Sequence, residues 1–132
     1  MVQKQTQPPF RILLAEDSAA IRAFTQTYFK DTSHHLDIAE NGHIALEKFK
    51  AGRPGLVFMD VEMPVMDGCT ATREIRKWEQ ESGLTPVPII ALTSHDVKEK
   101  IQEILKAGFT AHLTKPLTKG SMLKAIEDHK RR

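Results

Sequence analysis

Short runs of apolar residues alternate along this chain with longer segments in which apolar residues recur every three or four positions. The apolar runs cover 11–15, 34–39, 55–59, 87–92 and 110–114, lengths typical of β-strands. The periodic segments cover about 18–30, 42–51, 67–80, 96–108 and the stretch that begins at Thr118. Their spacing is that of amphipathic helices. We therefore predict five strands, each followed by a helix.

Helix boundaries and faces can also be predicted from the pattern. Asn41 is placed to cap the second helix and Gly52 to end it. Asp96, with Glu99 three residues later, marks the start of the fourth helix. The predicted inward faces are Ile21, Phe24 and Tyr28 in the first helix, and Val97, Ile101, Ile104 and Leu105 in the fourth.

Strands that alternate with helices predict an α/β protein with a parallel sheet covered by helices on both faces. Right-handed crossovers leave few arrangements, and five strands suit the doubly wound, flavodoxin-like order 2-1-3-4-5. In that order the strands at 11–15 and 55–59 are central neighbours. The run at 34–39 is the most polar, as expected of an edge strand.

Size and composition are those of a single soluble domain. The 132 residues suit one domain at 10–132, preceded by a lead-in at 1–9 that ends in two prolines. A net charge of +2 does not call for nucleic acid or membrane as a direct partner. No apolar run approaches the roughly 20 residues of a membrane span, and the N-terminus lacks the apolar core of a signal peptide. The single cysteine, Cys69, excludes an internal disulfide and suits a reducing compartment, so we expect a cytoplasmic protein.

Residues with carboxylate, hydroxyl or ammonium side chains stand at the ends of four of the five predicted strands. Glu16 and Asp17 follow the first strand, and Asp60 follows the third. Thr93 follows the fourth, and Lys115 follows the fifth, in a Lys-Pro bond of the kind that tolerates the cis form. Parallel strands bring their carboxyl ends to one edge, where open α/β sheets bind ligands. We expect these five side chains to converge there.

Three carboxylates at one edge predict a hard metal ion. Like charges this close repel, so at least one pKa should rise unless a cation joins them. Oxygen ligands without nearby histidine or thiolate suit Mg²⁺. A strand-end acid that only caps a helix would explain Asp17 alone, but not all three acids. The carboxylate of Asp60 could then attack an electrophilic phosphorus and form an acyl phosphate. Mg²⁺ and Lys115 would offset the charge on the phosphoryl oxygens, and the hydroxyl of Thr93 could donate a hydrogen bond to one of them.

Four motifs in this order resemble the receiver domain of bacterial response regulators. They are LLAEDS at 13–18, VFMDVEMPVMDG at 57–68, IIALTS at 89–94 and HLTKP at 112–116. The resemblance covers about 11–128, nearly the whole chain. It implies that Asp60 accepts a phosphoryl group from a phosphohistidine on a histidine kinase or a histidine phosphotransfer protein.

The resemblance implies roles for the other residues of this edge as well. Glu16, Asp17 and Asp60 would hold Mg²⁺ together with the backbone carbonyl of Glu62. Lys115 would pair with Asp60 and then with the phosphoryl group. The chain would catalyse only its own phosphorylation and dephosphorylation, and would be a monomer or a weak homodimer.

A conformational switch is also implied by the resemblance. Thr93 would turn toward the phosphoryl oxygen, and the side chain at position 112 would swing into the space released. The face built from the fourth helix, the fifth strand and the fifth helix would then change.

Some residues depart from the pattern of the family. Glu16 replaces a common aspartate, and His112 stands where Tyr or Phe is common, so its imidazole can also titrate. Glu62 and His95 stand at positions that, by the resemblance, tune the lifetime of the phosphoryl group in the family, so this lifetime stays unpredicted.

Two other functions fit parts of the sequence. An Mg²⁺-dependent phosphohydrolase with an aspartyl nucleophile would use Asp60 in a similar way, but its D-x-D motif would end in Glu62 and no segment supplies a cap for substrate. A flavodoxin-like cofactor binder would need an N–H-donating phosphate loop after the first strand, where Glu16 and Asp17 stand instead. Both a free-standing protein and a segment of a hybrid sensor kinase remain open.

Overall fold

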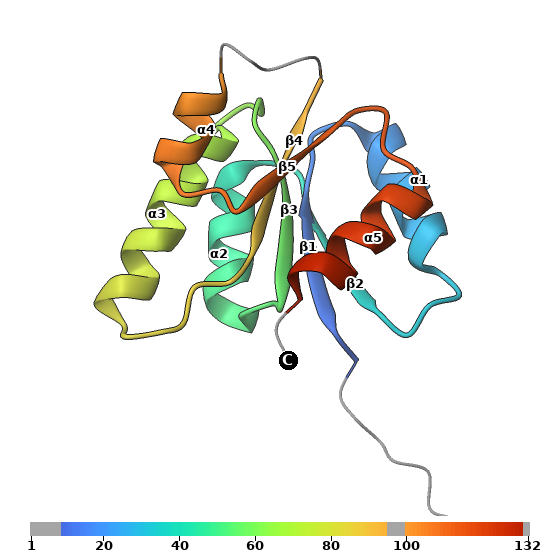
Figure 1. Ribbon diagram of the computed structural model, residues 1–132, viewed down its shortest axis with the longest axis horizontal. Coiled ribbons are helices and arrows are strands. Elements are labelled where there is room, and N and C mark those ends of the chain that lie inside the picture. The colour runs from blue at the N-terminus through green and yellow to red at the C-terminus, as the bar shows by residue number, and fades with distance from the viewer. Residues whose placement is uncertain (1–8, 95–99, 131–132) are drawn as a thin grey trace, which may run out of the picture.

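The computed structural model describes residues 9–94 and 100–130, which form five strands and five helices in alternation. The strands are β1 (Arg11–Ala15), β2 (His35–Ala39), β3 (Leu56–Asp60), β4 (Ile89–Thr93) and β5 (Ala111–Thr114). The helices are α1 (Ala19–Phe29), α2 (Gly42–Gly52), α3 (Gly68–Glu81), α4 (Ile101–Ala107) and α5 (Lys119–His129). All neighbouring strands are parallel, in the order β2-β1-β3-β4-β5 (Figure 1). The predicted doubly wound, flavodoxin-like α/β fold is confirmed.

Side chains of the central strands alternate between two apolar layers, as the two-residue repeat of a strand requires. Leu13 and Val57 contribute to the layer that includes α2, α3 and α4, whereas Leu14 and Phe58 contribute to the layer with α1 and α5. Figure 1 shows the same division of the helices between the two sides of the sheet. β2 is a partly exposed edge strand, as its polarity indicated. Within the described parts of the chain, no helix combines the length and the apolar character needed to cross a bilayer.

Two predicted helix starts are confirmed by capping contacts. Asn41 accepts a hydrogen bond from the backbone N–H of Ile44 at 2.8 Å and begins α2. Thr118 forms a reciprocal capping box with Ser121 and begins α5. Both caps satisfy backbone N–H groups that the first turn of a helix leaves without partners.

The predicted end of α2 was wrong by one residue. Gly52 is still helical, and Arg53 adopts the left-handed conformation, with φ 39°. The backbone N–H of Arg53 donates to Phe49 at 2.8 Å, and its guanidinium donates to the carbonyl of Thr85 at 2.7 Å. These contacts hold a non-glycine residue where glycine is usual.

The inward faces of two helices were partly mispredicted. On α1, Phe24 is 60% exposed and Phe29 is buried. On α4, Leu105 is 57% exposed and Ile104 is buried. The spacing of apolar residues defines a stripe along the helix. Which side of that stripe is buried depends on the elements packed against it. The predicted start of this helix lies at residues 95–99, outside the described part of the chain.

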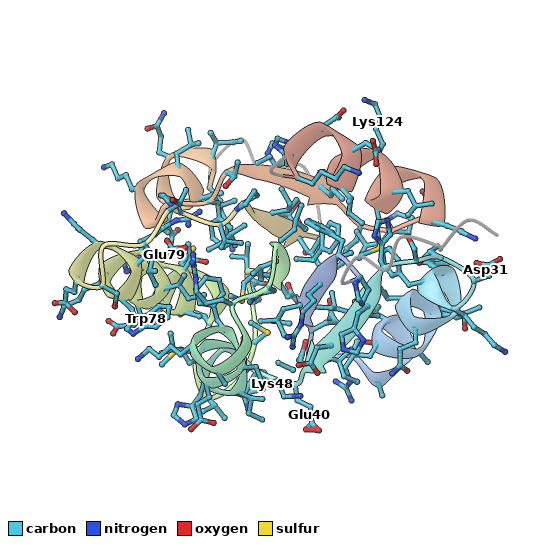
Figure 2. The ribbon with its side chains drawn as sticks, turned by 90° about the horizontal axis from the view of Figure 1, so that it is seen from below. Asp31, Glu40, Lys48, Trp78, Glu79 and Lys124 are labelled. Atoms are coloured by element: carbon cyan, nitrogen blue, oxygen red, sulfur yellow. The ribbon has the colours of Figure 1, made fainter. Side chains whose placement is uncertain are left out.

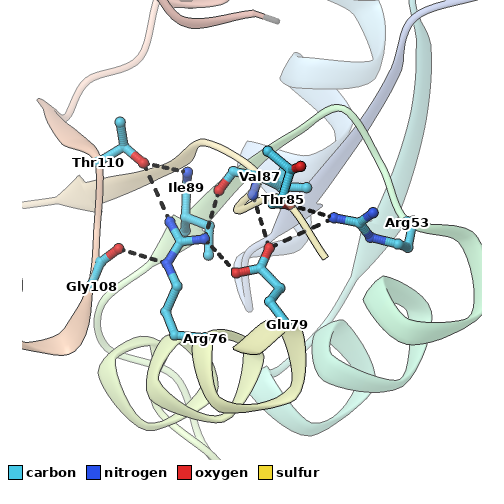
Figure 3. Close-up of polar contacts among 8 residues, drawn as sticks. All are labelled: Arg53, Arg76, Glu79, Thr85, Val87, Ile89, Gly108 and Thr110. Atoms are coloured by element: carbon cyan, nitrogen blue, oxygen red, sulfur yellow. Dashed lines mark hydrogen bonds and ion pairs between the residues drawn. The ribbon is translucent and has the colours of Figure 1, made fainter. Parts of the chain in front are cut away.

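A charged network joins α3 to the residues at the amino ends of β4 and β5 (Figure 3), whereas the predicted site lies at the carboxyl ends of the strands. Arg76 donates to the carbonyls of Gly108 at 2.9 Å and Val87 at 2.8 Å. It also pairs with the buried carboxylate of Glu79 at 2.8 Å, which in turn accepts from the N–H of Val87 at 2.8 Å. The network therefore supplies partners to backbone groups where the strands begin.

Trp78 and Glu79 are adjacent on α3 but contact different parts of the fold. Trp78 lies on the side toward α2 (Figure 2), where its ring meets Phe49 edge-on with centroids 6.0 Å apart. Glu79 belongs instead to the network at the starts of the strands (Figure 3). α3 is thus held both to a helix and to the sheet.

Candidate functional site

Three acidic side chains meet where β1 and β3 end. Glu16 and Asp17 directly follow β1, and Asp60 is the last residue of β3, which pairs with β1. Each of the three offers a carboxylate oxygen, and these oxygens lie within 4.8 Å of one another. Glu16 is 1% exposed and Asp60 is 5% exposed, whereas Asp17 faces solvent. The structure therefore brings together the three acids that the sequence predicted to converge.

The loop after β3 folds back against Asp60, and Gly68 allows the close approach. The N–H of Gly68 donates to the carbonyl of Val61 at 2.9 Å. A Cβ atom at position 68 would overlap the carbonyl oxygen of Asp60. Glycine is therefore needed at the start of α3 to bring this helix up to the acidic residue.

Lys115 contacts two of the three acids. Its ammonium lies 3.0 Å from Oε1 of Glu16 and 3.1 Å from Oδ2 of Asp60. Burial alone would lower the pKa of Lys115, but the close contact with Glu16 and the charges of Asp60 and Glu16 outweigh it and raise the pKa. Lys115 therefore stays charged in the site. The bond between Lys115 and Pro116 is cis.

The pKa of Glu16 is displaced by its surroundings. Burial raises it from the ordinary value of 4.5 to about 7, and the charge of Asp60 adds to the rise. The hydrogen bond from the backbone N–H of Ser18 and the ammonium of Lys115 act in the opposite direction. The expected rise in one of the clustered acids is therefore found, with loss of water as its largest cause rather than mutual repulsion.

The two acids after β1 differ in their contacts: the carboxylate of Glu16 has partners, whereas that of Asp17 has none among the described residues. Oε2 of Glu16 accepts from the N–H of Ser18 at 3.0 Å, whereas the buried Oε1 accepts no well-directed hydrogen bond despite its ion pair with Lys115. Asp17 has no hydrogen-bond or ion-pair partner for its side chain among the described residues. Ser18, not Asp17, caps α1. An incompletely paired buried oxygen beside an unpaired acid fits a hard cation such as Mg²⁺.

Among the described residues, the side chains of Thr93, the last residue of β4, and of His112 on β5 form no hydrogen bond or ion pair with the three acids. The buried hydroxyl of Thr93 donates to the carbonyl of Leu113 on β5 at 3.3 Å. The backbone N–H of Lys115 donates to the carbonyl of Thr93 at 2.6 Å. His112 is exposed on β5. Thr93 therefore connects β4 to β5 in this structure.

Two contacts around the site were not predicted from the sequence. Lys100, just before α4, forms an ion pair with Glu62 at 3.0 Å. Arg22 on α1 donates from Nη1 to the backbone carbonyl of Glu16 at 2.8 Å. Neither contact has a local sequence signal, since one joins residues far apart and the other depends on how α1 packs. The backbone carbonyl of Glu62, predicted as a metal ligand, stays a prediction.

Comparison with protein families decides the classification. The model of the response regulator receiver domain matches residues 12–127. The chain belongs to the receiver-domain family. The family acts in two-component phosphorelays as a signalling phosphoacceptor, which favours that interpretation over the phosphohydrolase and the cofactor binder.

Relatives of this receiver domain include both long and short proteins. It is 35% identical over 116 residues to the sensor histidine kinase GacS of Pseudomonas protegens, covering 88% of this chain. It is 36% identical over 118 residues to the chemotaxis protein CheY of Halobacterium salinarum, covering 89% of this chain. The matched region spans 13% of the length of GacS but 94% of that CheY.

Solved structures of other receiver domains have the same fold. One is the co-crystal structure of the Saccharomyces cerevisiae histidine phosphotransfer protein Ypd1 with the receiver domain of its downstream response regulator Ssk1. The match has a TM-score of 0.87 and 28% identity and covers 96% of this chain and 92% of that one. Another is the receiver domain of the sensor histidine kinase PA1611 from Pseudomonas aeruginosa, with a magnesium ion coordinated in its active-site cleft. Its TM-score is 0.81, with 28% identity and coverage of 92% and 97%.

Proposed function

We propose that this receiver domain accepts a phosphoryl group on Asp60 in an Mg²⁺-dependent transfer from a phosphohistidine. In this step the carboxylate oxygen of Asp60 forms a bond to phosphorus, the N–P bond of the donor breaks, and the donor imidazole leaves with the electron pair. The observation that carries the proposal is the Asp60 carboxylate itself, which lies within 4.8 Å of two other acids and 3.1 Å from Lys115. That arrangement combines a nucleophile, a cation site and a fixed positive charge.

The roles of the surrounding residues follow from their chemistry. Glu16, Asp17 and Asp60 would hold Mg²⁺ with the backbone carbonyl of Glu62, and the bound ion would neutralise charge on the phosphoryl oxygens. Lys115 supplies a second positive charge, 3.1 Å from Oδ2 of Asp60. Loss of Mg²⁺ should therefore stop the transfer, because the acids would repel the incoming phosphoryl group.

The proposed donor is a histidine kinase or a histidine phosphotransfer protein. Support comes from the Ssk1 receiver, whose solved structure contains the phosphotransfer protein Ypd1. Support also comes from an apolar groove of about 500 Å³ beside the site, between α1 and the segment that follows β5. Lys115 belongs to both the groove and the acidic site, so a protein seated in the groove would reach Asp60. The lining residues include Ile21, Phe24, Tyr28, Pro116 and Leu117.

A conformational response is part of the proposal. Phosphorylation would draw the hydroxyl of Thr93 from the carbonyl of Leu113 toward a phosphoryl oxygen, loosening the contact between β4 and β5. The side chain of His112 could then move, which would alter the face formed by α4, β5 and α5. Hydrogen exchange that is unchanged on this face after phosphorylation would contradict the switch.

The transfer can be tested with a small acyl-phosphate donor. Acetyl phosphate and Mg²⁺ should add one phosphoryl group to the intact mass of the wild-type chain. Asp60→Asn should abolish the gain, because its amide is a poor nucleophile. Cys69→Ala, which changes a buried residue of α3, should retain it. Omission of Mg²⁺ should abolish it in both active proteins. A gain retained by Asp60→Asn would overturn the assignment of the nucleophile.

A further inference from the structure

The backbone between Glu16 and Asp17 is held from α1 by Arg22. Nη1 of Arg22 donates to the carbonyl oxygen of Glu16 at 2.8 Å. On the opposite side of the same residue, the N–H of Glu16 donates to the carbonyl of Ala39 on β2 at 3.0 Å. Because a peptide group is planar, fixing the Glu16 carbonyl also fixes the N–H of Asp17 and limits where its Cα can lie.

The anchoring matters most for Asp17. Glu16 is buried, and its carboxylate is held by Ser18 and Lys115. Asp17 is exposed and has no side-chain partner among the described residues. The position of its carboxylate therefore depends on the backbone from which it projects, and Arg22 is the side chain that holds that backbone.

The position of Arg22 on its helix argues against a role in helix stability. Its backbone N–H donates to the carbonyl of Ser18, the N-cap of α1, so it lies one turn from the start of the helix. The positive end of the helix dipole disfavours a cation there. A residue selected only for the stability of α1 would be neutral or acidic at this position.

We propose that Arg22 is a positioning residue for the metal site, which orients Asp17 toward the cation by holding the carbonyl of Glu16. The proposal rests on the proposed function, since it requires the acidic cluster to bind Mg²⁺. It makes a prediction opposite in sign to simple electrostatics. A nearby cation repels Mg²⁺. If Arg22 acted only through its charge, its removal would therefore tighten Mg²⁺ binding. A positioning role means that its removal weakens binding.

The test is calorimetric titration of the whole chain with MgCl₂, without any phosphoryl donor. Arg22→Met keeps the aliphatic stem but loses the donors, and its Mg²⁺ dissociation constant should rise about tenfold, as for other residues that hold metal ligands in place. Arg22→Lys keeps one donor and the charge, and should recover most of the affinity. Lys77→Met removes an exposed positive charge on α3 and should bind like the wild type.

A second readout separates positioning from folding. Without Mg²⁺, the thermal midpoint of Arg22→Met should stay close to that of the wild type, because the lost hydrogen bond to Glu16 and the removed cation near the helix start act in opposite directions. Binding by Arg22→Met as tight as wild type or tighter would overturn the role of Arg22 alone. Weaker binding matched by a lower midpoint in the absence of metal would also overturn it, by showing a structural effect. Failure of the wild-type chain to take up Mg²⁺ would overturn the proposed function and this role together.

Discussion

The ammonium of Lys115 lies 3.1 Å from Oδ2 of Asp60, although 55 residues separate the two along the chain. The same ammonium lies 3.0 Å from Glu16. One cation therefore occupies the space between two carboxylates that a divalent ion would also approach. Removal of the lysine should therefore slow phosphoryl transfer without weakening metal binding.

Lys115→Met should slow phosphorylation by acetyl phosphate by about a hundredfold, the scale seen when one group that stabilises charge in a transition state is lost. Mg²⁺ binding should not weaken, because a competing cation has gone. Intact mass measured over time gives the rate, and calorimetry gives the affinity. Lys124→Met, which changes an exposed lysine of α5, should match the wild type in both. Phosphorylation of Lys115→Met at the wild-type rate would contradict the role of the lysine.

The raised pKa of Glu16 predicts how stability depends on pH. The folded chain holds the Glu16 proton up to about pH 7, whereas the unfolded chain releases it near 4.5. Between these values the folded state binds more protons, so the free energy of unfolding contributed by Glu16 falls as pH rises and levels off above pH 7. The pKa of Lys115 is also raised, so its contribution is present below pH 10.5 and is lost only as pH rises beyond that value.

Urea unfolding at pH 5, 6, 7 and 8 would check this dependence. The difference in unfolding free energy between the wild type and Glu16→Gln isolates the contribution of this carboxyl group. As pH rises, the unfolding free energy of the wild type should fall relative to that of Glu16→Gln. Saturating Mg²⁺ should reduce the shift, because the ion binds the deprotonated form. A difference that does not change from pH 5 to pH 8 would show that the Glu16 pKa is not displaced.

The contact between Gly68 and the backbone of Asp60 predicts a strong effect of one methyl group. Gly68→Ala places a Cβ against the carbonyl of Asp60 and should lower the unfolding free energy by about 1–3 kcal/mol. It should also slow phosphorylation, because the carbonyl and the attached side chain must shift.

A second glycine in a helix provides the matched control. A Cβ at Gly120 on α5 meets no neighbouring atom within 4 Å. Gly120→Ala should be neutral or stabilising by up to about 1 kcal/mol, since alanine favours helix. Equal effects of the two substitutions in urea unfolding would show that the contact at Gly68 is not limiting.

The Arg76–Glu79 pair predicts a stability effect that leaves the chemistry intact. Glu79 is 2% exposed, so Arg76→Met would leave a buried carboxylate without its closest cation. The unfolding free energy should fall by about 3–5 kcal/mol. Phosphoryl uptake without denaturant should persist, because the pair lies at the other edge of the sheet. Arg73→Met, on the exposed side of α3, should change stability little. A loss equal to that of Arg73→Met would mean that Glu79 needs no buried partner.

Much of the site could be predicted from local sequence. Alternating strand and helix patterns, with right-handed crossovers, left few possible strand orders, and the doubly wound order suited five strands. Residues at the carboxyl ends of strands are carried to one end of the sheet by the strands themselves, so the sequence alone could place Glu16, Asp17, Asp60 and Lys115 together. The cap at Asn41 could also be predicted from the sequence, because capping depends on residues within one turn.

Other features depended on how the elements pack. The exposure of Phe24 and Leu105 was mispredicted, because a helical stripe does not specify which of its edges the sheet covers. The contacts of Arg22 with the Glu16 carbonyl and of Lys100 with Glu62 arise from long side chains that reach across neighbouring elements.

The sequence by itself determined the strands and helices and the chemical groups at the carboxyl ends of the strands, and it limited the strand order to a few arrangements, because these features follow from short-range periodicity and chain connectivity. Only the tertiary structure decided which of those groups are buried, which have hydrogen-bond or ion-pair partners, and which are exposed without such partners among the described residues. Burial gives Glu16 a pKa of about 7, while exposure leaves Asp17 dependent on its backbone. These properties depend on distance and solvent access in three dimensions, and residues remote in the chain supply both.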